Sequence, residues 1–307
     1  MRPFRCVAIG ESLYDRFGNA DVLGGAPVNF AVHLAALLAD RARVSVLTRV
    51  GDDHLGRRLI REVESRNVLS DLIEVDAELP TGTVDVAVDA DGQPTYAIAR
   101  PVAWDAIEAT PGAVAEIESA DAVVFGTLAQ REAISRRSTL ALLQASSARL
   151  RVFDANIRPD FADESILTES MRLATHLKVS DAELQRVCAV AGITSAGVAA
   201  ADRRSACLTL IDAFDLDAVT VTRGAAGTEH HTAQGCTAPG AVSVHAEPNA
   251  DAVGAGDACL AGLVAGLLVE MDTDRAVRLA NTMGAFVASR RGGTPQVPPE
   301  ILGLALP

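Results

Sequence analysis

A segment near the C-terminal end combines small residues, two carboxylates and the start of an apolar run. It reads Asp251-Ala-Val-Gly254-Ala255-Gly256-Asp257 and continues into the uncharged stretch Ala258–Val269. Small residues let the chain turn tightly into a helix, whose free amides and positive dipole end converge on an anion. Asp257 would then be a general base that takes a hydroxyl proton while the amides hold a transferring phosphoryl group. The alternative is that Asp257 only caps the helix, and the residues alone leave both open.

A second segment, Gly24-Gly25-Ala26-Pro27-Val28-Asn29, has the composition of a helix start that accepts a ligand. Pro27 suits the first position of a helix, and the glycines allow a ligand to approach the backbone closely. Asn29 would lie in the first turn, where its amide could hydrogen-bond a polyol. The alternative is an ordinary Gly-Pro helix start with a solvated Asn29.

Several common catalytic motifs do not occur in the sequence. There is no P-loop, no G-x-S-x-G elbow and no H-E-x-x-H. The first apolar run is followed by Ile9-Gly10-Glu11-Ser12 in place of G-x-G-x-x-G, which argues against a dinucleotide-binding oxidoreductase. His230 and His231 are adjacent, so their side chains would point apart and suit a shared metal poorly.

The composition excludes other classes of protein. The 307 residues are 49% hydrophobic and 22% charged, which is typical of a globular chain with a large core. The net charge of −13 argues against nucleic acid or an anionic membrane as a partner. Lys178 is the only lysine, so Schiff-base chemistry could use only that residue.

The five cysteines are odd in number, scattered and never in C-x-x-C spacing. They are expected to be reduced thiols in a cytoplasmic protein. The N-terminus does not resemble a signal peptide, and the 12-residue run Ala258–Val269 is too short to span a bilayer.

Short apolar runs alternate with helical patterns along the chain, which predicts one α/β domain over residues 1–307 with a doubly wound, mainly parallel sheet. Ligands of such sheets bind beyond the carboxyl ends of the strands. The expected strands are Cys6–Ile9, Val44–Leu47, Ala122–Phe125, Leu150–Phe153, His176–Val179 and Ala218–Thr222. The expected helices lie near 27–40, 53–65, 131–147, 163–174, 181–190, 201–214, 257–270 and 273–290.

One region departs from this alternation. Val84, Val86 and Val88 alternate with other residues, Asp91-Gly92 is a hairpin turn signal, and a second extended run includes Tyr96. The pattern predicts a small antiparallel insert over about residues 80–103, with part of 11–23, that is either a lid or an ordinary edge hairpin. Because its apolar face is too small to be stable alone, we expect it to form a homodimer contact.

Taken together, the motifs described above resemble those of the ribokinase-like sugar kinases, the PfkB family. GGAPVNFA and DAVGAGDA are similar to the two signatures of that family. Five further segments match in order, so that the resemblance spans residues 5 to 298, nearly the whole chain. They are the VGxDxxG-like Val50–Gly56, the DxNxRP segment from Asp154, the KxSxxE segment from Lys178, the TxGxxG segment from Thr222, and Asn281 with Ser289–Gly292.

The resemblance implies a role for each site residue. Asp257 would be the base, and Gly254, Ala255 and Gly256 would form the anion hole. Arg158 would offset phosphate charge or make a structural ion pair. Sugar contacts are implied for Asp15, Gly25 and Asn29, and from the lid for Tyr96 and Arg100. ATP contacts are implied for Lys178, Ser180, Thr222, Gly224, Gly227 and Asn281. Glu183 would organise Mg²⁺ and its waters, and Asp251 with residues 289–292 would bind a monovalent cation, K⁺.

The resemblance therefore implies an ATP-dependent kinase of a sugar hydroxyl, with a ketohexose such as fructose favoured by GGAP and DxNxRP. Ala252 and Val253 replace threonines that are frequent in the family, so this chain has no side-chain hydroxyl at these two positions. The alternatives are a kinase of the same family for ribose, a nucleoside or a sugar acid, and a catalytically idle sugar-binding protein on this fold.

Overall fold

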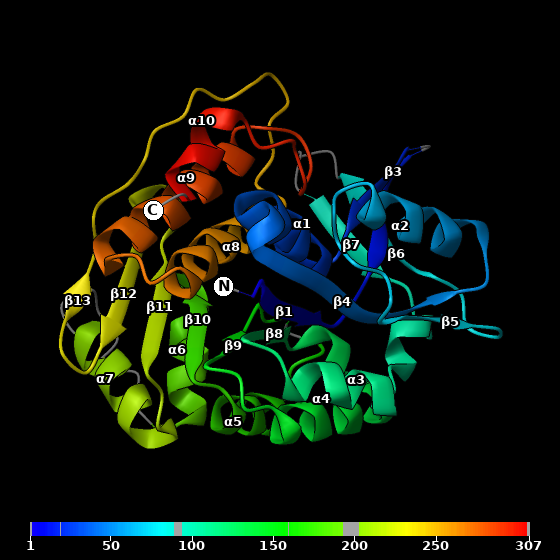
Figure 1. The fold of residues 1–307 in the computed structure, drawn as a ribbon, viewed down its shortest axis with the longest axis horizontal. Coiled ribbons are helices and arrows are strands. Elements are labelled where there is room, and N and C mark those ends of the chain that lie inside the picture. Colours follow the sequence, from blue (N-terminus) through cyan, green and yellow to red (C-terminus); the bar gives the residue numbers. More distant parts are fainter. Residues whose placement is uncertain (1, 19, 89–93, 159, 193–202, 306–307) are drawn as a thin grey trace.

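A nine-stranded sheet forms the centre of the computed structural model, which describes residues 2–18, 20–88, 94–158, 160–192 and 203–305 (Figure 1). The strand order is β13-β12-β11-β10-β9-β8-β1-β4-β5. The strands are β1 (Phe4–Ile9), β4 (Ala42–Gly51), β5 (Ile73–Asp76), β8 (Ala122–Gly126), β9 (Leu150–Asp154), β10 (His176–Ser180), β11 (Ala218–Thr222), β12 (Thr228–Thr232) and β13 (Cys236–Thr237).

The sheet is parallel from β5 to β11, and only β12 and β13 pair antiparallel. This confirms the predicted doubly wound, mainly parallel sheet. All six predicted strands are present, and their apolar runs are buried because helices cover both faces. The carboxyl ends of the parallel strands meet at one edge, where the loops after β1, β8, β9 and β10 lie together.

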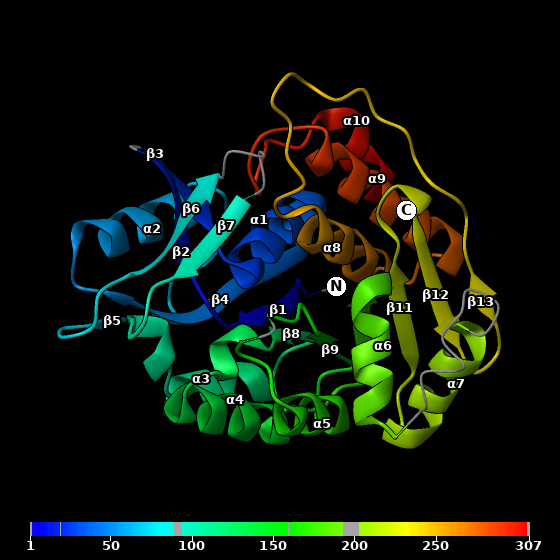
Figure 2. The same ribbon diagram turned by 180° about the vertical axis from the view of Figure 1, so that it is seen from behind.

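Helices pack on the sheet in two layers, as Figures 1 and 2 show from opposite sides. One face carries α1, α2, α8 and α9, and the other carries α3 to α7. Only α3 among these was not predicted, and residues 201 and 202 of one predicted helix lie outside the described residues. The helices are α1 (Ala26–Leu38), α2 (His54–Glu64), α3 (Pro111–Glu118), α4 (Ala133–Ala145), α5 (Glu164–Leu173), α6 (Asp181–Val190), α7 (Arg203–Phe214), α8 (Ala255–Leu268), α9 (Thr273–Ala288) and α10 (Pro299–Leu302).

A second sheet stands beside α1 and α2 (Figure 2). It contains β3 (Ala20–Gly24), β2 (Leu13–Phe17), β6 (Gly82–Val88) and β7 (Pro94–Ile98), in that order. It consists of two antiparallel hairpins whose central strands, β2 and β6, pair in parallel. Both predicted segments therefore contribute to one insert, although the predicted turn Asp91-Gly92 lies outside the described residues.

The fully buried indole of Trp104 anchors this second sheet to the main domain. A Cβ on Gly82 in β6 would lie 2.3 Å from Trp104 Nε1, so only glycine allows the strand to approach the ring so closely. The chain has one tryptophan, and its fluorescence therefore reports on the base of the insert.

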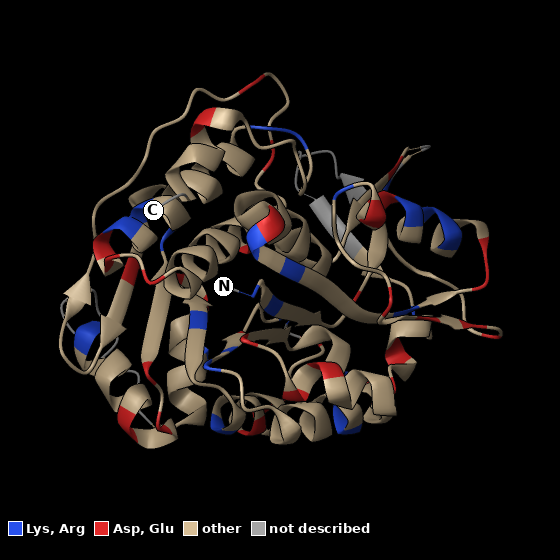
Figure 3. Ribbon diagram, in the orientation of Figure 1, with Lys and Arg blue, Asp and Glu red and all other residues tan. Residues whose placement is uncertain are grey.

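Acidic and basic residues are interspersed over the ribbon in Figure 3. None of the helices that the structure describes is both long and apolar enough to cross a bilayer.

Candidate active site

The first turns of α1 and α8 bring together the two residues that the sequence singled out. Asn29 Nδ2 donates a hydrogen bond of 2.9 Å to Asp257 Oδ2, and both side chains are buried. The N-cap of α8 is Gly254, whose φ of 73° lies in the left-handed region that favours glycine. The carboxylate of Asp257 is therefore directed at another helix and does not occupy the cap position of its own.

The surroundings of Asp257 suit a base. Burial raises the pKa of Asp257 above its usual range, while Lys178 and the hydrogen bond from Asn29 oppose that rise. A carboxylate with a raised pKa takes a proton more readily at neutral pH than an exposed one does. The geometry thus supplies a buried proton acceptor at a helix N-terminus.

A buried ion pair lies beneath this helix. Lys178 Nζ is 2.9 Å from both carboxylate oxygens of Asp154. Burial alone would lower the pKa of Lys178, but the charges of Asp154 and Asp257 outweigh it and raise the pKa. The lysine is therefore protonated and is not available as a Schiff-base nucleophile. Its ammonium group lies 3.1 Å from where a Cβ of Gly256 would be, directly under the first turn of α8.

The backbone at the start of α8 offers free donors. The amide of Ala255, one of the three expected anion-hole residues, donates to Ala252 O at 3.2 Å. In the part of the chain that the structure describes, the amides of Gly256 and Asp257 have no hydrogen-bond partner. With the helix dipole and the Lys178 ammonium behind them, these two amides form a site for a negative charge.

The loop after α9 holds this turn in place. A Cβ on Gly254 would lie 2.6 Å from the Cα of Gly293, so the two backbones are in direct contact. Asp251 joins the same loop to the segment before α8: its Oδ2 accepts from Gly292 N and its Oδ1 from Val253 N, both at 3.0 Å. The structure therefore brings Asp251 and the 289–292 segment together, as the resemblance implied.

His33 fixes the loop from the other side and was missed by sequence reasoning. Its Nε2 lies 2.9 Å from Gly293 O, and burial lowers the pKa of His33 to about 4. The imidazole is thus neutral at pH 7 and donates from Nε2 to the carbonyl. Since Asn29 also packs against Gly293, one face of α1 positions both Asp257 and the loop beside Gly254.

The expected nucleotide residues gather at the ends of β10 and β11. Ser180 and Thr222 are direct neighbours in the sheet register. Gly227 has a φ of 85°, and a Cβ there would lie 3.2 Å from Asn281 Nδ2. Asn281 Nδ2 also donates to Gly240 O at 2.7 Å. Gly224 begins the 3-10 turn Gly224–Ala226 between β11 and β12.

Glu183 has a clear local role. Its Oε2 accepts from the backbone amide and hydroxyl of Ser180, both at 2.7 Å, which forms a capping box at the start of α6. Its Oε1 accepts from Ile157 N. The carboxylate therefore holds the loop after β9 against α6.

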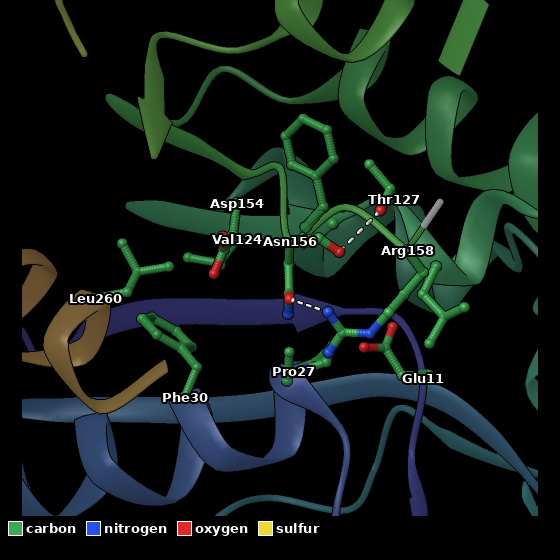
Figure 4. Close-up of a pocket in the computed structure, with 13 residues that line it drawn as sticks. Glu11, Pro27, Phe30, Val124, Thr127, Asp154, Asn156, Arg158 and Leu260 are labelled. Atoms are coloured by element: carbon green, nitrogen blue, oxygen red, sulfur yellow. Dashed lines mark hydrogen bonds between the residues drawn. The ribbon is translucent and has the colours of Figure 1, made fainter. Parts of the chain in front are cut away.

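A pocket lies between α1 and the ends of β8 and β9, lined by Glu11, Pro27, Phe30, Asn156 and Arg158 among others (Figure 4). The guanidinium of Arg158 donates to Asn156 Oδ1 at 3.0 Å and faces Glu11. Among the described residues no carboxylate lies within ion-pair distance of Arg158, so the structural ion pair considered for it does not form.

Asp15 and Gly25 lie near two residues of this pocket, Arg158 and Glu11. Burial raises the pKa of Asp15 to about 6, with the charge of Arg158 opposing the rise and that of Asp251 adding to it. Gly25 has a φ of 102°, and a Cβ there would lie 2.5 Å from Glu11 O. This close approach places the N-terminus of α1 against the loop after β1.

Glu11 is a second residue that sequence reasoning missed. It is 5% exposed, and burial raises its pKa to about 7, with Arg158 opposing and Asp257 adding to the rise. In the sequence, Gly10-Glu11 shows only that the G-x-G-x-x-G fingerprint is absent. The position of Glu11 directly after the inner strand β1, at the carboxyl edge of the sheet, was the signal that could have identified it.

The substitution Glu11→Gln is expected to raise stability at pH 8 more than at pH 5. Glu11 binds its proton more tightly in the folded protein than in the unfolded chain. Folding stability therefore falls as pH rises from about 4.5 to about 7, by at most about 3 kcal/mol. A glutamine does not titrate, so the variant has no such loss. Urea unfolding of both proteins at the two pH values measures it, and an equal difference at both would contradict the prediction.

Tyr96 and Arg100 were expected to contact the sugar from the lid. Arg100 is exposed and pairs with Glu132, with Nε 2.6 Å and Nη2 2.5 Å from Oε1, so its described contacts lie at the start of α4. The expected contact of Arg100 with a sugar stays a prediction. Tyr96 lies in β7, and its side chain is outside the described residues.

Comparison with known proteins places this geometry in a family. The family model described as pfkB family carbohydrate kinase matches residues 13–300. A fructokinase of Klebsiella pneumoniae is 30% identical over 292 residues, covering 90% of this chain and 88% of the relative.

Two solved structures show the same fold. The fructokinase of Xylella fastidiosa with bound ATP has a TM-score of 0.81 at 21% identity and covers 98% of this chain and 97% of its own. A double mutant of the Vibrio cholerae O395 fructokinase, with fructose, ADP and potassium ion bound, has a TM-score of 0.77 at 26% identity and covers 99% and 98%. With the family model matched over most of its length, the chain belongs to the PfkB family of carbohydrate kinases and is an ATP-dependent sugar kinase.

Proposed function

We propose that this kinase transfers the γ-phosphoryl group of ATP to a hydroxyl of a ketohexose such as fructose, with Asp257 as the general base. The observation that supports this most is the buried Asp257 beside the free amides that begin α8. The similarity to fructokinases of several organisms favours a ketohexose over the other substrates of the family.

In this mechanism Asn29 holds Asp257 by its 2.9 Å hydrogen bond so that the carboxylate faces the sugar hydroxyl. Asp257 accepts the hydroxyl proton as the oxygen attacks the γ-phosphorus in line with the leaving ADP oxygen. The amides of Gly256 and Asp257 and the Lys178 ammonium stabilise the charge on the transferring group. Arg158, which has no ion-pair partner among the described residues, adds a positive charge at the mouth of the pocket.

The sugar would lie between α1 and the second sheet. Asp15, Gly25 and Asn29 would contact it there, and Gly25 lies directly against Glu11 O. The nucleotide would lie over β10 and β11, with Thr222, Gly224, Gly227 and Asn281 around it. Glu183 would hold Mg²⁺ through water, because its carboxylate already accepts three hydrogen bonds from the chain. The ion would neutralise phosphate charge, and Mg²⁺ commonly keeps several waters.

A panel of sugars tests the substrate directly. The formation of ADP is measured with fructose, glucose, ribose, a nucleoside and a sugar acid at equal concentration. The proposal expects the highest kcat/KM for fructose. A higher kcat/KM for ribose, a nucleoside or a sugar acid would replace the ketohexose by that substrate. Binding of sugar without ADP formation would favour the idle sugar-binding protein.

Activity is expected to rise several-fold when a large organic cation in the buffer is replaced by K⁺. Asp251 and the loop before Gly293 offer hard oxygen ligands next to Gly254, and a cation there would brace the turn that carries the free amides. Initial rates in potassium and tetramethylammonium chloride at equal ionic strength measure this. Equal rates would contradict a cation site at Asp251.

We also propose that the second sheet mediates a homodimer, because its outer strands β3 and β7 have open edges that can pair with a second copy of the chain.

A further inference from the structure

Three side chains with metal-binding donors meet at the outer edge of the main sheet, on β12 and β13 (Figure 1). Glu229 and His231 are two residues apart on β12, so they point to the same face. Cys236 is paired directly with His231 in the register of β12 and β13. His231 Nε2 is 3.0 Å from Glu229 Oε2 and 3.9 Å from Cys236 Sγ.

The adjacent His230 takes no part in this cluster. Its Nδ1 lies 2.9 Å from Thr220 Oγ1 on the neighbouring strand, so the two histidines point apart as the sequence predicted. His231 instead meets Glu229 along the strand and Cys236 across it, which the sequence did not predict.

We propose that Glu229, His231 and Cys236 bind a thiophilic divalent metal ion such as Zn²⁺. Tetrahedral zinc with bonds of about 2.0–2.3 Å to oxygen, nitrogen and sulfur keeps its ligand atoms about 3.3–3.6 Å apart. The three donor atoms lie within 4.8 Å of one another, so small side-chain movements bring them to that spacing. Cys236 is exposed, which leaves a path for the ion and a fourth position for water.

The surroundings orient the carboxylate for this task. Glu229 Oε1 is 3.1 Å from Arg203 Nη1 and 3.3 Å from Arg223 Nη1, and Oε2 is left to face His231. Partners behind a ligand hold it in position. The same two positive charges repel a cation, so we expect weaker binding than at a closed site of four cysteines.

Binding of the ion requires one proton to leave Cys236 and one to change its place on His231. The thiol proton of Cys236 leaves to solvent, and the imidazole proton of His231 moves from Nε2 to Nδ1 as the ion takes Nε2. Nδ1 is buried and has no partner among the described residues in either tautomer, so this move breaks no further hydrogen bond. The hydrogen bond between His231 and Glu229 is replaced by two bonds to the metal.

Cobalt titration of the metal-free protein under reducing conditions tests the site, because Co²⁺ replaces Zn²⁺ and absorbs light. We expect a thiolate-to-cobalt charge-transfer band and the visible bands of tetrahedral cobalt, saturating at one equivalent and lost when Zn²⁺ is added. Cys236→Ser should abolish the charge-transfer band, and His231→Gln should weaken cobalt binding about tenfold or more. His54→Gln, which changes an exposed histidine at the start of α2, is the matched control and should bind as the wild type does.

Two results would overturn the proposal: no charge-transfer band at saturating cobalt in the wild type, or a band that survives in Cys236→Ser. Because Cys236 is exposed, its replacement should leave the circular dichroism spectrum unchanged, and Cys236→Ala serves as a second variant. Asp257→Asn should keep the cobalt spectrum, which separates this site from the proposed catalytic one.

Discussion

Asp257→Asn is expected to lower kcat by about 10²–10⁴ while the protein stays folded. A general base contributes about that factor, which corresponds to roughly 3–5 kcal/mol of barrier. The asparagine keeps the size of the side chain and an oxygen that can accept from Asn29 Nδ2. It cannot accept the proton of the sugar hydroxyl. Steady-state kinetics on the best sugar of the panel, at saturating ATP, measures the effect.

The control for this variant is its stability and its ATP affinity. Removing a buried carboxylate whose pKa is raised by burial should leave the melting temperature equal or higher. ATP binding should be unchanged or tighter, because a negative charge facing the γ-phosphate is gone. A variant that keeps more than about a tenth of the wild-type kcat would rule out Asp257 as the base.

Lys178→Met is expected to lower the free energy of unfolding by about 3–5 kcal/mol, because it leaves the Asp154 carboxylate buried without its partner. Both oxygens of Asp154 lie 2.9 Å from Lys178 Nζ, and the pair is almost fully buried. Urea unfolding at pH 8 measures the loss.

A second change tests the cause of that loss. In the double variant Lys178→Met/Asp154→Leu no buried charge of the pair is left without its partner, so most of the lost stability should return. If the double variant is as unstable as Lys178→Met, the ion pair is not the reason for the loss. If Lys178→Met is as stable as the wild type, the lysine is not needed to compensate Asp154.

The sheet was predictable because its central strands are continuous apolar runs. Cys6–Ile9 and Ala122–Phe125 contain only apolar residues and are fully buried, and the local sequence shows that directly. Strand β12, Thr-Glu-His-His-Thr, is polar and was missed, because its place is set by pairing with β11 and by Arg203 contacting Glu229. Such contacts form only in the folded chain, so a short stretch of sequence does not reveal them.

The candidate site also contains some residues that the sequence identified and others that it did not. Asn29 and Asp257 each stand in a recognisable helix start, and the structure brings them together although 228 residues separate them. Glu11 and His33 carry no local motif. Their roles arise from a pocket beside Arg158 and from the carbonyl of Gly293, and both require the folded chain. Arg100 was expected at the sugar only through the family resemblance, and its pairing with Glu132 also forms only in the folded chain.

Analysis of the product by mass spectrometry tests the central claim most directly. The wild-type protein is incubated with ATP, Mg²⁺, K⁺ and fructose, and the sugar is examined for the gain of one phosphoryl group. The account predicts one phosphorylated sugar for each ADP formed, and almost none with Asp257→Asn. ADP formed without a phosphorylated sugar, or no phosphorylated product from any sugar of the panel, would contradict it.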